Sequence, residues 1–247
     1  MKHIGILAHS AEGATLCYRE TWMEGVRRLG AHQHPEITMT GVGMAALLDA
    51  WEANDLPALR SAFVRDGAKL AAAGADFFVC PDNTAHIALE YAGEPFPIPC
   101  LHIGEVVAGQ AQSDRRHKVG ILGTKWTMTG PVYPGAFDRR GIGWGVPDEA
   151  DRKTIDDIIF GELCLGVFTD DSRNAYVRII EKLAEQGCDA VALVCTEIPL
   201  LITEQASPLP ILDSTRLLAR AAVAVAIGEQ PMPEWRGGPV AERVAAE

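Results

Sequence analysis

The 247-residue sequence lacks the patterns that define several common classes of function. Its six cysteines form no CxxC pair, and no Gly-rich phosphate loop or dinucleotide fingerprint is present, so we expect no metal and no cofactor. The chain has 22 Lys and Arg against 33 Asp and Glu, for a net charge of −11. Without a long basic run, nucleic acid and anionic membranes are excluded as expected partners, and a small-molecule ligand is favoured.

Long apolar runs are also missing. No stretch approaches the roughly 18 apolar residues of a membrane span, and Ile4–Leu7 is too short for the apolar part of a signal peptide. We therefore expect a cytoplasmic protein whose cysteines are reduced thiols. With 48% hydrophobic and 22% charged residues, the chain can bury one large core or two small ones.

Short apolar runs are present, and they alternate with helical stretches. Strand–helix alternation of this kind predicts an α/β protein with parallel sheets covered by helices on both faces. The expected strands are 4–7, 38–43, 77–80, 99–102, 119–122, 143–146, 190–194 and 211–212. The expected helices are 13–30, 44–53, 57–73, 83–92, 104–112, 149–166, 170–186, 197–204 and 214–227, and a segment near 130–140 is left unassigned.

Three sequence landmarks recur in the same order at separations of 115, 113 and 111 residues: Gly5 with Gly120, Gly74 with Gly187, and Pro97 with Pro208. Such a repeat predicts two pseudo-symmetric parallel-sheet domains of the Rossmann-like or flavodoxin-like type. We expect the first at 1–103 plus 213–228 and the second at 104–212. Residues 229–247 lose periodicity and are predicted as a C-terminal tail, ordered by packing onto a neighbouring subunit.

The repeat makes two strand ends equivalent. Eight residues after Gly74 the chain reaches Asp82, and eight residues after Gly187 it reaches Cys195. The next positions pair Asn83 with Thr196 and Thr84 with Glu197, each at the expected start of a helix. Because ligands bind at the carboxyl ends of strands in open parallel sheets, we expect both ends to serve one active site in the cleft between the domains.

Two proton-transfer groups acting on opposite faces of a carbon allow racemisation without a cofactor. A cysteine suits this task, and we expect the pKa of the Cys195 thiol to be lowered by the helix that follows it. Asp82 has two interpretations that the sequence leaves open, an acid/base group or an N-cap of the next helix.

Further polar residues are candidates for substrate binding. His86 lies one helical turn after Asp82. The loops after the first strand of each half carry His9 with Ser10 and Thr124 with Lys125, in which the hydroxyls are hydrogen-bond donors and His9 and Lys125 are cations.

Together these residues resemble the aspartate/glutamate racemase family over nearly the whole length, to about residue 228. The motifs that carry the resemblance are Gly5-Ile-Leu, Asn83-Thr-Ala-His, Val119-Gly-Ile-Leu-Gly-Thr, Glu162-Leu-Cys-Leu-Gly and Cys195-Thr-Glu-Ile-Pro-Leu-Leu. The resemblance implies a cofactor-independent racemase or epimerase of an amino acid or a related 2-substituted carboxylic acid, active as a homodimer. Cys195 would act on one face of the substrate, and Asp82 replaces the cysteine that precedes Asn83 in family racemases.

This replacement leaves alternatives open. The chain could be a single-cysteine isomerase or decarboxylase similar to arylmalonate decarboxylase or maleate isomerase, or an inactive protein that binds small acids. No clear Arg or Lys is found for a second substrate carboxylate, since Cys164 stands about where a lysine is often found in the family. The substrate is therefore expected to be a small carboxylate, with a monocarboxylate accepted at least as readily as an acidic amino acid.

Overall fold

The computed structural model describes residues 1–240 and divides into two compact units. The first unit comprises residues 1–103 and the chain from Thr215 onward, and the second comprises residues 104–214. Residues 241–247, which end the predicted tail, lie outside the described residues. Among the described residues, no helix is both long enough and apolar enough to cross a membrane.

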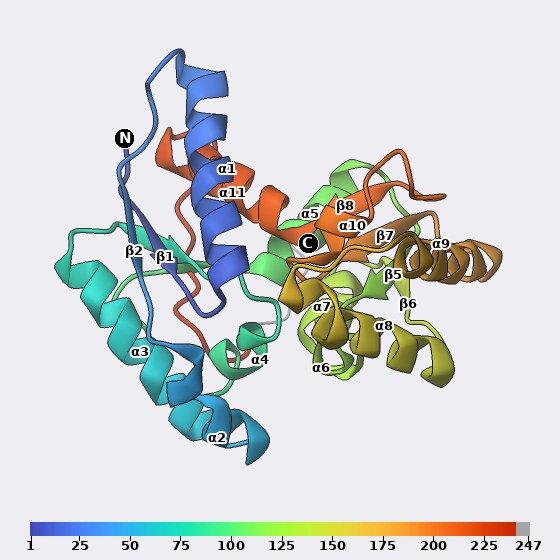
Figure 1. Cartoon of the computed structure of the whole chain (residues 1–247). Coiled ribbons are helices and arrows are strands. Elements are labelled where there is room, and N and C mark those ends of the chain that lie inside the picture. The colour runs from blue at the N-terminus through green and yellow to red at the C-terminus, as the bar shows by residue number, and fades with distance from the viewer. Residues whose placement is uncertain (241–247) are drawn as a thin grey trace. The chain divides into compact units, whose positions relative to one another are not determined.

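The first unit contains a parallel sheet with the strand order β2-β1-β3-β4. Its strands are β1 (Ile4–Leu7), β2 (Ile37–Thr40), β3 (Phe77–Val79) and β4 (Cys100–Leu101). Its helical segments are α1 (Ala11–Leu29), η1 (Met44–Ala46), α2 (Leu48–Glu52), α3 (Leu56–Ala72), α4 (Ala85–Leu89) and α11 (Ser214–Ala226). Figure 1 shows α1 and α11 together on one side of this sheet and α3 on the other. An ion pair of 3.9 Å between Arg216 and Glu20 joins α11 to α1.

The second unit repeats this arrangement, with a parallel sheet of order β6-β5-β7-β8. Its strands are β5 (Lys118–Leu122), β6 (Gly143–Gly145), β7 (Ala190–Leu193) and β8 (Ile211–Asp213). Its helical segments are α5 (Ile103–Ser113), α6 (Lys125–Thr129), α7 (Val132–Asp138), α8 (Glu149–Gly161), η2 (Leu163–Leu165), α9 (Asp170–Glu185) and α10 (Ile198–Leu201). The predicted α/β fold with two equivalent parallel sheets is thereby confirmed.

The second sequence landmark is a Gly-x-Asp motif, Gly74-Ala-Asp in the first unit and Gly187-Cys-Asp in the second, and it has the same role in both units. Gly74 and Gly187 have φ angles of 90° and 88°, a left-handed conformation that favours glycine, and they turn the chain from a helix into a strand. Two residues later, a carboxylate accepts a backbone N–H at the start of the unit's first strand. Asp76 binds the N–H of His3 at 2.7 Å, and Asp189 binds that of His117 at 2.8 Å. These shared contacts fix the point at which β3 and β7 begin.

Side chains along β7 point alternately to the two faces of the sheet, and this pattern sets the direction of Cys195, which follows the strand. Val191 and Leu193 are fully buried in the apolar core beneath α8 and α9, where they pack with Ile155 and Ile180. Burying a side chain of this size contributes roughly 1.5–3 kcal/mol. Cys195 continues the same alternation and belongs to the same core, so its sulfur lies at the edge of a tightly packed apolar layer.

Several predicted helices are shorter than expected. The stretch 83–92 contains only α4, 197–204 contains only α10, and 149–166 divides into α8 and η2 after Gly161. Gly166 closes η2 in a left-handed conformation with φ 73°. Helix α6 was not predicted, because residues 125–129 follow the strand directly and were expected in a loop.

The last described residues lie against the first unit of their own chain. The N–H of Cys100 in β4 donates to the carbonyl oxygen of Trp235 at 2.7 Å. The N–H of Phe96 donates to the carbonyl oxygen of Arg236 at 2.9 Å. The Arg60 guanidinium holds the same segment through the Arg236 carbonyl at 3.2 Å. The expectation that the tail is ordered by a neighbouring subunit is therefore wrong for this stretch.

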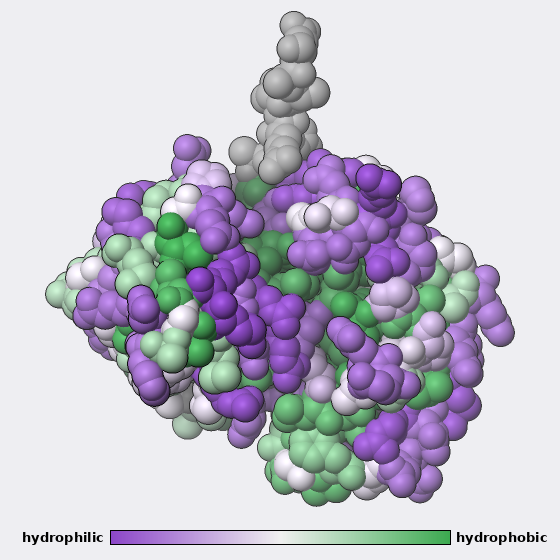
Figure 2. Space-filling view, turned by 90° about the horizontal axis from the view of Figure 1, so that it is seen from above, coloured by the Kyte–Doolittle hydropathy of each residue, from purple (hydrophilic) through white to green (hydrophobic). Residues whose placement is uncertain are grey.

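Hydrophilic residues predominate on the face shown in Figure 2, and apolar residues form smaller areas between them. Among the exposed apolar side chains, Trp126 and Phe160 contact each other edge to face, with ring centroids 6.0 Å apart.

Candidate active site

The end of β7 presents a thiol that is hydrogen-bonded to a carboxylate. Cys195 is 9% exposed, and its Sγ lies 3.0 Å from Oε2 of Glu197. The hydroxyl of Thr196 donates to the same oxygen at 2.7 Å. Because an ionised carboxylate can only accept, the thiol and the hydroxyl both act as donors here. Glu197 thus holds Cys195 in its protonated form.

The surroundings of Cys195 raise its pKa well above the usual value for a thiol. Burial is the largest cause, and the negative charge of Glu197 and its hydrogen bond add to it. The expectation of a lowered pKa was wrong, because the sulfur is buried and a carboxylate stands directly beside it. At neutral pH the thiol is a proton donor.

Two further residues interact electrostatically with this thiol. Tyr176 on α9 is fully buried, and its hydroxyl has no hydrogen-bond partner among the described residues. Burial raises its pKa, and Cys195 and Glu197 add to this increase. Cys164 in η2 has an exposed side chain, yet partial burial of its thiol and the negative charge of Glu197 raise its pKa to about 11. No pattern in the sequence points to Tyr176, since only the fold places α9 over β7.

The end of β3 presents a carboxylate that caps the next helix. Oδ1 of Asp82 accepts the backbone N–H of Ala85 at 3.0 Å, which satisfies a donor at the start of α4. Asn83 is buried and Thr84 is half-buried beside it. Cys80 points into the core of the first unit, where burial raises its pKa well above the usual value. The N-cap interpretation of Asp82 is therefore realised through one oxygen of its side chain.

His86 is fully buried, and both of its ring nitrogens contact backbone groups. Nδ1 lies 2.8 Å from the carbonyl oxygen of Asp82, and Nε2 lies 3.3 Å from the N–H of Ile103. Burial and the neighbouring His102 hold the pKa of His86 well below its usual range. His86 was predicted to bind substrate, but in this structure its ring nitrogens contact the protein's own chain.

The hydroxyls predicted after the first strand of each unit are N-caps. Ser10 accepts the N–H of Gly13, and Thr124 accepts the N–H of Thr127, each at 3.3 Å. His9 lies in the same loop, and its Nε2 accepts the indole N–H of Trp51 at 3.0 Å. An acceptor nitrogen carries no proton, so His9 is a neutral ring in this arrangement and not the cation that we expected.

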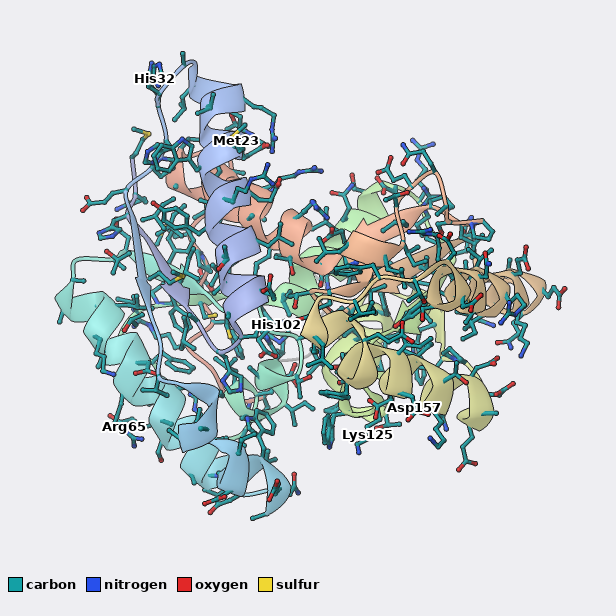
Figure 3. The ribbon with its side chains drawn as sticks, viewed as in Figure 1. Met23, His32, Arg65, His102, Lys125 and Asp157 are labelled. Carbon is teal, nitrogen blue, oxygen red and sulfur yellow. The ribbon has the colours of Figure 1, made fainter. Side chains whose placement is uncertain are left out.

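Lys125 is exposed at the start of α6. Its Nζ lies 4.5 Å from the centroid of the Trp126 ring, and its backbone N–H donates to Asp156 at 2.9 Å. Figure 3 shows Lys125 among the exposed side chains of the second unit and His102 in the first unit, beyond the end of β4. The ammonium group is thus engaged by an aromatic face of its own unit.

The structure gathers the predicted site residues into two separate sets, one per unit. Asp82, Asn83, Thr84 and His86 lie together after β3, with His9 and Ser10 after β1. Cys195, Thr196 and Glu197 lie together after β7, with Thr124 and Lys125 after β5. Within residues 1–240, no group of three or more His, Cys, Asp or Glu side chains could hold a metal ion.

Known proteins are similar to this chain in sequence and fold. A family model described as Asp/Glu/Hydantoin racemase matches residues 6–222. The broad-specificity amino-acid racemase RacX of Bacillus subtilis is 23% identical over 172 residues, which cover 70% of this chain and 74% of that protein.

Two solved structures are similar over 92% of this chain and all of their own. A candidate Asp/Glu racemase from Yersinia pestis has 31% sequence identity and a TM-score of 0.83. An aspartate racemase homologue from Pyrococcus horikoshii has 25% identity and a TM-score of 0.76.

Proposed function

Because the chain belongs to the Asp/Glu/hydantoin racemase family, we propose that it is a cofactor-independent racemase or epimerase in which Cys195 and Asp82 exchange the Cα proton of the substrate. The family resemblance and the isomerase class predicted from the sequence are confirmed by the matching relatives, which are racemases. The pair of residues and the substrate belong to the proposal.

The opposite hydrogen-bonding roles of the two groups support this mechanism most directly. The Cys195 thiol donates to Glu197, whereas the Asp82 side chain accepts from Ala85. A two-base racemase needs one protonated group and one unprotonated group before each turnover, because one removes a proton and the other supplies one. The Cys195 thiol supplies the protonated member of this pair, and Asp82 is the proposed unprotonated member.

In the forward direction, the Asp82 carboxylate takes the Cα proton of one enantiomer and becomes a carboxylic acid. The electron pair of the broken C–H bond stays on the substrate as an enolate, and the Cys195 thiol delivers its proton to the opposite face of Cα, leaving a thiolate. The reverse direction starts from the thiolate and the carboxylic acid. The raised pKa of Cys195 makes that thiolate a strong base toward a carbon acid.

The proposed substrate is a small carboxylate, and an amino acid with an uncharged side chain is preferred to an acidic one. Lys125 is engaged by Trp126, and His9 is neutral, so neither expected cation is presented as a partner for a second carboxylate. The homodimer implied by the family resemblance and the cytoplasmic location expected from the sequence remain predictions.

Solvent exchange tests the proposal. The purified protein is incubated in heavy water with each member of a panel of L- and D-amino acids and 2-substituted acids, and deuterium at Cα is measured by mass spectrometry together with optical rotation. We expect deuterium incorporation coupled to inversion for at least one substrate. Absence of exchange across the whole panel would contradict the proposed function.

One observation favours a second function. Since Asp82 already uses one oxygen to cap α4, the carboxylate could serve the structure alone and leave Cys195 as the sole proton donor. The chain would then act as a single-thiol decarboxylase or isomerase. Release of carbon dioxide from malonate-type acids, or isomerisation of an unsaturated diacid without Cα exchange, would select this function. Thermal stabilisation by such acids without turnover would instead indicate a binding protein.

A further inference from the structure

We propose that His86 is a positioning residue that holds the backbone of Asp82 in place through a neutral ring protonated on Nδ1. This inference rests on the proposed role of Asp82. It gives His86 a task distinct from the substrate binding predicted from the sequence.

The two contacts of the ring determine its protonation by geometry. A carbonyl oxygen can only accept, so Nδ1, at 2.8 Å from the Asp82 oxygen, must carry a proton. A backbone N–H can only donate, so Nε2, at 3.3 Å from the Ile103 nitrogen, must present a lone pair. One tautomer satisfies both contacts. A doubly protonated ring would lose the contact with Ile103.

The contact with Asp82 orients the peptide unit that carries the acid/base group. In a trans peptide the C=O and the following N–H point in opposite directions, so fixing the Asp82 carbonyl toward His86 turns the Asn83 N–H away from it. The side chain of Asp82 is held at its other end by the N–H of Ala85. Two independent hydrogen bonds therefore limit the movement of the carboxylate.

The contact with Ile103 connects Asp82 to the point where the chain leaves the first unit. Ile103 is the last residue of that unit before Gly104, and it begins α5. His86 thereby ties the loop after β3 to the residue that follows β4 by two positions. A shift of the loop requires a change at both contacts.

Neighbouring rings keep His86 in this position. His102 packs edge to face against it, with centroids 4.8 Å apart, and binds Glu90 through Nε2 at 2.8 Å. Trp235 stacks on His86 at 6.4 Å with an interplanar angle of 12°. Trp235 belongs to the C-terminal segment that is bonded to β4 at Cys100, so this segment covers the ring of His86.

A matched pair of substitutions separates the two contacts. The amide of His86→Asn places a donor near the position of Nδ1 and keeps the bond to Asp82, whereas His86→Gln reaches the position of Nε2 and keeps the bond to Ile103. Each variant loses one buried backbone contact, so the two should be destabilised to a similar extent. We expect kcat for racemisation to fall about 100-fold in His86→Gln with little change in KM, and less than tenfold in His86→Asn. Equal loss in the two variants at equal Tm would overturn the inference.

Two measurements do not depend on activity. Nitrogen-15 NMR of the imidazole should show a proton on Nδ1 and none on Nε2 at neutral pH, and a charged ring or the opposite tautomer would overturn the proposal. Amide exchange at Ala85 should accelerate in His86→Gln more than in His86→Asn. If the wild-type protein exchanges no substrate proton, the proposed function fails, but these two results still decide whether His86 holds Asp82.

Discussion

The ends of β3 and β7 occupy equivalent places in the two units but present different chemistry. At Asp82 the side chain accepts a backbone N–H, and a buried histidine holds the backbone. At Cys195 the side chain is a donor, and its partner is the carboxylate two residues later. One end is stabilised by backbone groups and the other by a side chain.

The difference shows which parts of a duplicated fold can vary. The strand orders match, the Gly-x-Asp turns have nearly the same φ and the same carboxylate contact, and a hydroxyl caps the helix that follows the first strand of each unit. The residues just beyond β3 and β7 diverge in chemistry. The duplicated scaffold delivers two side chains to equivalent positions without determining what those side chains are.

Removal of the Cys195 thiol should cause the largest loss of Cα exchange at either strand end. We expect Cys195→Ala to reduce Cα exchange by about 10²–10⁴-fold, the usual contribution of a positioned acid/base group. Cys188→Ala is the matched control, because Cys188 is buried in the same core. Cα exchange is measured by deuterium incorporation, and Tm is the check on folding. Equal exchange rates in the two variants would contradict the role assigned to Cys195.

Substitution of Asp82 separates its two roles. Asp82→Asn keeps an oxygen for the Ala85 N–H but cannot transfer a proton, so we expect a loss of about 10²–10³-fold in exchange at nearly unchanged stability. Asp82→Ala should also lose about 1 kcal/mol of unfolding free energy, measured by urea denaturation. Asp82→Cys makes the two ends alike and should exchange faster than Asp82→Ala. Full activity in Asp82→Asn would leave Asp82 only a capping role.

Substitution of Glu197 changes the protonation of Cys195 rather than its position. The charge and the hydrogen bond of Glu197 favour the protonated thiol and raise its pKa, so Glu197→Gln should lower the pKa of Cys195 and increase the thiolate fraction at a given pH. The measurement is the pH dependence of alkylation by iodoacetamide in a Cys164→Ala background, followed by peptide mass spectrometry. Glu162→Gln is the control, and an upward shift in Glu197→Gln would contradict the assigned contact.

The two capping hydroxyls should give the smallest effects. Ser10→Ala and Thr124→Ala each remove one N-cap bond, and we expect each to cost about 1 kcal/mol of unfolding free energy without a change in KM. A raised KM in one variant alone would assign substrate binding to that unit's loop, and thermal denaturation with steady-state kinetics distinguishes the outcomes.

Much of the fold could be predicted because the landmarks are local. Gly74 and Gly187 mark turns that need a left-handed residue, and apolar runs of four or five residues identify the buried strands. Helix lengths were less predictable. The stretch 149–166 has helical periodicity throughout, yet the chain changes direction after Gly161, and only packing decides where α8 ends.

The positions of the candidate site residues at the strand ends could be predicted from the sequence, but their hydrogen bonds could not. Sequence spacing identified Asp82 and Cys195 as equivalent, and it left the capping role of Asp82 open. It could not show that Glu197 folds back onto the thiol, because contacts between residues two apart depend on local dihedral angles. The expected lowering of the Cys195 pKa failed because burial, which is the largest cause, and this carboxylate both raise it. The contact of Nε2 of His86 with Ile103, 17 residues away, depends on tertiary structure.

The segment 235–238 closes the exposed edge of β4. The backbone bond from Cys100 occupies a donor that this edge strand otherwise offers to an extended peptide, and the bond from Phe96 holds the segment against the residues just before β4. A chain shortened before Trp235 would present those donors to neighbouring molecules, and edge-to-edge association is the usual result. The segment 235–238 thus protects this edge from association, and an affinity tag or fusion partner is safer at the N-terminus than immediately after this segment.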